Sequence, residues 1–77
     1  MSKLPKKLKR LKIERNIKSK EIVAAVSKYC DSPITSQAVS NWLSEKRCPK
    51  KLKYDNAVAL VLYSRNFITM KDCGYEA

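Results

Sequence analysis

The chain has 77 residues, of which 44% are hydrophobic, and carries a formal net charge of +10 at pH 7. This length supports one domain, whose core is too small to hold both a scaffold and a deep catalytic cleft. Histidine is absent, which removes the usual neutral-pH acid and base and every His-assisted nucleophile. We therefore expect a protein that is not an enzyme and needs no cofactor.

The cysteine pattern argues against a metal site. Cys30, Cys48 and Cys73 are odd in number and widely spaced, which suits neither a disulfide framework nor a zinc centre. Reduced thiols are typical of a reducing compartment. No apolar run is long enough to span a bilayer, and no apolar segment follows the basic N-terminus as in a secretory signal. These features predict a cytoplasmic protein without a membrane partner.

The first predicted helix contains Leu4, Leu8 and Leu11 at the spacing i, i+4, i+7. That periodicity indicates an amphipathic helix, and Pro5 is tolerated in a first helical turn. Asn16 is expected to end the helix. A basic amphipathic helix can also bind anionic membranes, but we favour a core role because a small domain needs these leucines.

A second helix is predicted over residues 19–29, with Ser19 as its N-cap. Its apolar stripe is expected to consist of Ile22, Ala25, Val26 and Tyr29. The sequence Asp-Ser-Pro at residues 31–33 should then break the chain.

A short third helix is predicted over about residues 35–45, with Thr35 as the N-cap and Pro49 as the outer limit. Helical spacing separates its residues into two faces. The inward face is expected to consist of Ile34, Val39, Trp42 and Leu43. The outward face is expected to consist of Ser36, Gln37, Ser40, Asn41 and Ser44.

From Asp55 onward a fourth helix is predicted, because residues 57–63 are apolar on every side. This helix should close the core, and its apolar stretch 57–63 is our candidate for a dimer surface. An alternative pairs residues 60–63 and 67–70 as a short β-hairpin, since periodicity does not decide between the two. Residues 71–77 are expected to be loose. The predicted organisation is therefore one compact four-helix, all-α domain over residues 1–66 and a C-terminal tail over residues 67–77.

The outward face of the third helix carries amides and hydroxyls, where a merely soluble helix would carry Lys and Glu. Asn and Gln can bond an adenine edge in the major groove, and Ser can bond bases or phosphates. Strong positive charge follows the helix, where it would meet the DNA backbone. The predicted phosphate contacts in this segment are Lys46, Arg47, Lys50 and Lys51.

Positive charge is concentrated in two blocks of the sequence. Residues 1–20 hold nine basic residues and one acidic residue, and residues 46–53 hold five basic residues and no acidic residue. A polyanion is the natural partner of such blocks, because each neutralised phosphate releases counterions. The alternative is a soluble protein with Lys-rich solvated faces.

The segment Ile-Thr-Ser-Gln-Ala-Val-Ser-Asn-Trp-Leu-Ser-Glu-Lys-Arg-Cys-Pro, residues 34–49, resembles the recognition helix and following turn of the Cro/repressor-type (lambda-repressor-like) helix-turn-helix family. The residues that match the family pattern are Thr35, Val39, Ser40, Trp42, Lys46 and Pro49. The four-helix layout extends the resemblance to about residues 4–64. In one respect the chain departs from the family, because Ile34 follows Val26 by eight positions with no glycine between them. This departure predicts a longer second helix or a wider turn.

The resemblance implies a sequence-specific regulator of transcription, a Cro-like repressor from a phage or prokaryote. It implies binding to double-stranded DNA as a homodimer on a pseudo-palindromic operator. The base-reading residues that it implies are Thr35, Ser36, Gln37, Ser40, Asn41 and Ser44. At the start of the second helix it implies phosphate contacts by Lys18, Ser19 and Lys20, and it places Trp42 in the core.

Two other functions stay open from the sequence. One is a sequence-indifferent nucleic-acid-binding protein, although such proteins favour charge and exposed aromatic rings over an amide-rich helix. The other is the DNA-binding antitoxin of a toxin–antitoxin pair, with residues 66–77 binding the toxin.

Overall fold

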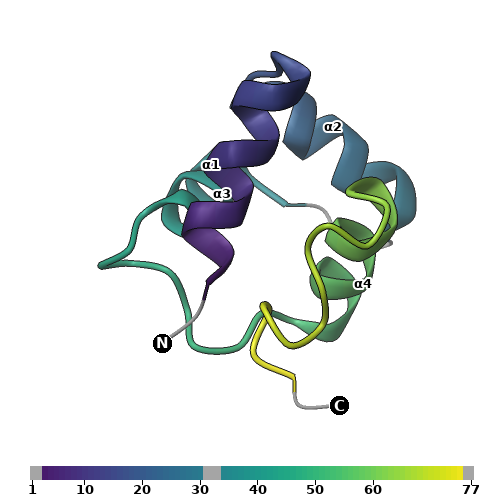
Figure 1. Ribbon diagram of the computed structural model, residues 1–77. Coiled ribbons are helices and arrows are strands. Elements are labelled where there is room, and N and C mark those ends of the chain that lie inside the picture. The colour runs from purple at the N-terminus through teal and green to yellow at the C-terminus, as the bar shows by residue number, and fades with distance from the viewer. Residues whose placement is uncertain (1–2, 31–33, 76–77) are drawn as a thin grey trace.

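The computed structural model describes residues 3–30 and 34–75. Over these residues the chain forms four helices and no strand: α1 (Leu4–Arg15), α2 (Ser19–Tyr29), α3 (Ser36–Leu43) and α4 (Tyr54–Tyr63). Helix α1 packs on α3, while α2 packs on both α3 and α4 (Figure 1). The prediction of a four-helix, all-α domain is confirmed, and the alternative β-hairpin over residues 60–70 is wrong.

Helix α1 follows the sequence prediction closely. Pro5 lies in its first turn, and Leu4, Leu8 and Leu11 are buried. Asn16 ends the helix in the left-handed conformation, at φ 51° and ψ 51°, and its amide donates to the carbonyl of Ile13. Asparagine is among the few residues that adopt this conformation readily.

The start of α2 differs from the prediction by one residue. Lys18 has the extended backbone of an N-cap, and Ser19 is already helical. The Ser19 hydroxyl accepts a hydrogen bond from Nζ of Lys12 at 3.2 Å, while the carboxylate of Glu21 accepts from the Lys18 amide at 3.4 Å. Ser19 therefore links α2 to α1 and does not cap α2.

The apolar stripe of α2 is shorter than predicted. Ile22 and Val26 are buried and Ala25 is half-buried, but the side chain of Tyr29 is 52% exposed. Cys30 is buried instead, and its thiol donates to Oδ1 of Asn56 at 3.3 Å. Helix α2 ends at Tyr29 and Cys30 has an extended backbone, so the side chain of Cys30 does not continue the exposed face of Tyr29. The predicted break at residues 31–33 lies outside the described residues.

Helices α3 and α4 supply the rest of the helical core. In α3, Val39 and Trp42 are buried, as predicted, and the neighbouring Ile34 and Leu43 are half-buried against the core. In α4 the buried apolar residues are Ala57, Ala59 and Leu60, whereas Leu62 is 54% exposed. Most of the apolar stretch 57–63 thus closes the core. Leu62 is the large side chain of this stretch that stays exposed.

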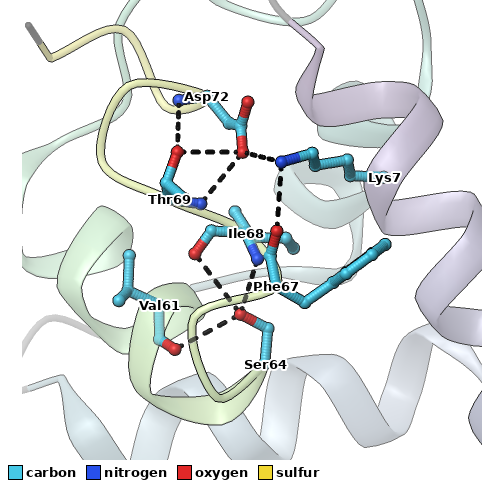
Figure 2. A network of polar contacts seen from close by, with 7 residues as sticks. All are labelled: Lys7, Val61, Ser64, Phe67, Ile68, Thr69 and Asp72. Carbon is cyan, nitrogen blue, oxygen red and sulfur yellow. Dashed lines mark hydrogen bonds and ion pairs between the residues drawn. The ribbon is translucent and has the colours of Figure 1, made fainter.

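The chain after α4 is packed, so the prediction that residues 71–77 are loose is wrong for residues 71–75. Arg65 and Asn66 adopt positive φ angles of 54° and 70° and turn the chain back over α4. The buried Ser64 hydroxyl accepts from the amide of Ile68 at 2.9 Å and donates to the carbonyl of Val61 (Figure 2). Ile68 and Cys73 then enter the same core as the helices, at 0% and 1% exposure.

An ion pair joins this C-terminal segment to α1. Nζ of Lys7 donates to Oδ2 of Asp72 at 2.7 Å and to the carbonyl of Phe67 at 3.1 Å (Figure 2). The same carboxylate oxygen accepts from the amide and the hydroxyl of Thr69, each at 3.0 Å. Asp72 is only 7% exposed. This network fixes residues 67–72 against the first helix.

The ion pair predicts a loss of stability in acid. Burial acts to raise the pKa of Asp72, but hydrogen bonds from Lys7 and Thr69 outweigh it and hold the pKa below its ordinary value. A carboxyl group whose pKa is lower in the folded state stabilises the fold above its unfolded pKa of about 4. That stabilisation is lost as the pH falls through the lowered folded value.

We expect Asp72→Asn to lower the free energy of unfolding at pH 7 by about 1–3 kcal/mol, because it removes a hydrogen-bonded charge. The difference between this variant and the wild type should shrink below about pH 4. Urea unfolding between pH 7 and pH 2 checks this. A difference that stays constant over the whole pH range would contradict the role of the ionised carboxylate.

Candidate nucleic-acid interface

The N-terminus of α3 is capped by a predicted base-reading residue. Oγ1 of Thr35 accepts a hydrogen bond from the amide of Ala38 at 3.1 Å. Such a cap typically stabilises a helix by about 1 kcal/mol. Thr35 is exposed, so its hydroxyl can still donate to a ligand while it caps the helix.

Two amide side chains lie together on the outer face of α3. Nε2 of Gln37 donates to Oδ1 of Asn41 at 3.1 Å, one turn along the helix. Gln37 is exposed and Asn41 is half-exposed, while Ser36 and Ser40 on the same face are exposed. The amide hydrogen bond leaves Oε1 of Gln37 as a free acceptor and Nδ2 of Asn41 as a free donor. An adenine edge in the major groove requires an acceptor and a donor side by side.

Ser44 has a local structural role that the sequence did not predict. It is the C-cap of α3, and its hydroxyl accepts from the amide of Arg47 at 3.3 Å. Its carbonyl accepts from the amide of Cys48 at 2.9 Å. Ser44 is half-buried and holds the turn that leads to the basic residues.

The basic segment after α3 is exposed. In Figure 1 the chain between α3 and α4 swings out to one side of the body before it returns to α4. All four predicted phosphate contacts in it, Lys46, Arg47, Lys50 and Lys51, are exposed. Nζ of Lys51 lies 4.6 Å from the centroid of the Tyr75 ring.

The C-terminal segment anchors the return of this basic segment. The amide of Leu52 donates to the carbonyl of Cys73 at 3.0 Å, and the hydroxyl of Tyr75 donates to the carbonyl of Leu52 at 2.7 Å. The rings of Tyr75 and Tyr54 also form a T-shaped pair, with centroids 5.7 Å apart. The basic residues are thus attached to the core and not carried on a free loop.

Gly74 makes this attachment sterically feasible. Its φ is +100°, and a Cβ atom at this position would collide with the carbonyl oxygen of Lys50 and lie 2.7 Å from Cα of Lys51. Only glycine adopts that backbone at so close an approach. Sequence analysis missed this contact, although the presence of a single glycine in the chain was a usable signal.

The third predicted group of contacts lies at the N-terminus of α2. Lys18 and Lys20 are exposed, and Ser19 is half-buried through its bond to Lys12. Helix α2 packs against α3, but no described hydrogen bond or ion pair connects residues 18–20 with the outer face of α3. Among the predicted site residues, the structure therefore brings Gln37 and Asn41 into contact. Lys18 and Lys20 are exposed cations that are not bonded to this pair.

The cysteines are free thiols. Burial raises the pKa of Cys48, and burial together with the charges of Asp72 and Cys48 raises the pKa of Cys73 to about 12. Both thiols are therefore protonated at neutral pH and are poor nucleophiles. Across residues 3–30 and 34–75, no three acidic or cysteine side chains gather as metal ligands.

None of the described helices combines the length and the apolar composition needed to cross a membrane. No family model, curated protein or solved structure matches this chain significantly.

Proposed function

We propose that this protein is a sequence-specific, duplex-DNA-binding regulator of transcription. The observation that carries the proposal is the pair of outward-facing amides on α3, exposed Gln37 bonded to half-exposed Asn41, opposite the buried Val39 and Trp42. A helix that buries one face and offers paired amides on the other suits insertion into the major groove, which is wide enough to admit it.

The side chains suited to base contacts and those suited to phosphate contacts lie on separate segments of the chain, and this separation supports the proposal. The outer face of α3 lacks charged side chains, and the basic residues Lys46, Arg47, Lys50 and Lys51 follow it on an anchored segment. Phosphate contacts fix the position and supply affinity, whereas base contacts select the sequence. In the proposed complex, Lys18, Ser19 and Lys20 add phosphate contacts from the N-terminus of α2.

We further propose that the protein binds as a homodimer to a two-fold operator, in the manner of Cro-like repressors. Exposed Leu62 on α4 is our candidate for the centre of the dimer surface. Paired half-sites about one helical turn apart would then be read by two copies of α3. A regulator of this kind acts in the cytoplasm of a prokaryotic cell, on the nucleoid.

Salt dependence tests the phosphate contacts. We expect Lys46→Ala to weaken binding to specific and random duplexes alike and to lower the slope of log affinity against log salt by about 1. The matched control is Lys28→Ala, an exposed lysine of α2 outside both basic blocks, which should leave the slope unchanged. Fluorescence anisotropy from 50 to 300 mM salt, roughly the range where such slopes are measured, gives both values. Equal slopes for the two variants would remove Lys46 from the interface.

A further inference from the structure

An open cavity lies between the start of α1, the segment after α3 and the C-terminal segment. Its volume is about 950 Å³, within the range of small-molecule sites. The parts of the chain that form its walls are distant in sequence, with Lys6, Lys50 and Lys71 contributed by the three different segments. Among the described lining residues, Lys50 alone was predicted from the sequence as a phosphate contact.

The walls of the cavity are held in place without a ligand. Gly74 lies directly against the backbone of Lys50, and Tyr75 bonds the carbonyl of Leu52. The Lys7–Asp72 ion pair connects the C-terminal segment, which forms one wall of the cavity, to α1. A preformed concave site loses less free energy to ordering when a ligand binds.

The charge of the lining is unbalanced. Four lysines, Lys3, Lys6, Lys50 and Lys71, surround the cavity, and Glu45 is the one acid among the lining residues that the structure describes. Within residues 3–30 and 34–75, none of these four ammonium groups has a carboxylate at ion-pair distance, whereas that of Lys7 is paired with Asp72. Like charges around a concave surface focus a positive potential that attracts an anion.

The remaining lining is apolar or aromatic. Pro5 and Pro49 form part of the wall, together with the ring of Tyr75. A ligand that combines an anionic group with a flat, weakly polar group would therefore match both parts of the cavity, since rings pack well against prolines and aromatic faces.

We propose that this cavity binds a phosphate group through Lys3, Lys6, Lys50 and Lys71, with the organic part of a nucleotide-sized ligand against the prolines and Tyr75. Lysine binds phosphate as a point charge. The phosphate group belongs either to a free nucleotide or to the backbone of bound DNA, and the test below distinguishes these two sources. This site is distinct from the outer face of α3, and it does not depend on base reading.

NMR titration provides a test that needs no operator. Gly74 is the only glycine in the chain and lines the cavity, so its amide signal is a convenient reporter. The probes are ATP, inorganic triphosphate, adenosine and a short random duplex, each added at about 0.15 M salt. We expect ATP and triphosphate to shift the Gly74 signal and adenosine alone to leave it unchanged.

Two double variants with the same change of charge provide the comparison. Lys6→Gln with Lys71→Gln removes two lining charges, whereas Lys9→Gln with Lys28→Gln removes two exposed charges elsewhere. The first should weaken the binding of triphosphate by about tenfold, as expected for two lost ion pairs, and the second should have little effect.

The probes also separate the two sources of phosphate. A shift of Gly74 with ATP or triphosphate assigns the site to a free ligand, and a shift with the duplex alone assigns it to the DNA backbone. No shift with any phosphate probe, or equal affinities for the two double variants, would overturn the proposal. None of these outcomes depends on sequence-specific DNA binding, so failure here is distinguishable from failure of the proposed function.

Discussion

Replacing Gln37 with alanine is expected to weaken binding to the preferred duplex by about 1–3 kcal/mol, while leaving binding to random DNA nearly unchanged. The reason is that Gln37 is exposed on α3 and carries no charge, so it can add selectivity but little general affinity. Competition anisotropy with the preferred duplex and an unrelated duplex measures both affinities. Equal losses on the two duplexes would contradict base reading by Gln37.

A double-variant cycle sharpens this prediction. Gln37 and Asn41 are hydrogen-bonded to each other, and residues in one hydrogen-bond network are coupled by about 0.5–3 kcal/mol. The losses for Gln37→Ala, Asn41→Ala and the double variant on the preferred duplex should therefore not be additive. Additive losses would mean that the two amides contact DNA independently.

Replacing Ile68 with alanine is expected to destabilise the fold by about 2–5 kcal/mol, because a buried aliphatic side chain is lost and a cavity remains. Ile68 is 0% exposed, and its amide is bonded to Ser64. A domain of this length is stable by only roughly 4–12 kcal/mol, so the variant should lose a large share of its free energy of unfolding. Urea unfolding followed by circular dichroism measures the change.

Ile13→Ala is the matched control for Ile68→Ala. It removes the same aliphatic side chain at a position of α1 that is 79% exposed, and surface substitutions of this kind usually change stability by less than about 0.5 kcal/mol. If Ile68→Ala were as mild as Ile13→Ala, the C-terminal segment would not be part of the core.

Sequence periodicity predicted the helices well where a single apolar face dominates. The leucines of α1 and the pair Val39 and Trp42 of α3 are buried as their spacing requires. The preference of threonine for the N-cap also predicted the start of α3 correctly, because the Thr35 hydroxyl accepts from the backbone amide of Ala38 in the same helix. Ser19 shows the limit of this reasoning, because its hydroxyl bonds Lys12 of another helix.

Contacts between distant segments were beyond prediction from the sequence. The burial of Ile68 and Cys73 depends on the turn through Arg65 and Asn66 and on the ion pair of Lys7 with Asp72. These residues are separated by up to 65 positions, and no periodicity reports such pairing. The predicted base-reading residues lie along one helix and its ends, so the periodicity of that segment was enough to choose them. The lysine-lined cavity is formed by three segments that are distant in sequence, so it could not be predicted.

Selection from a random duplex library at about 0.15 M salt tests the central proposal most directly. The full chain would be immobilised, and the retained duplexes would be sequenced after several rounds. A regulator that reads bases through α3 should enrich one motif with two-fold related halves about one helical turn apart, and Gln37→Ala should weaken or alter that enrichment. Uniform retention of the library would contradict base reading and leave a basic, sequence-indifferent nucleic-acid-binding protein.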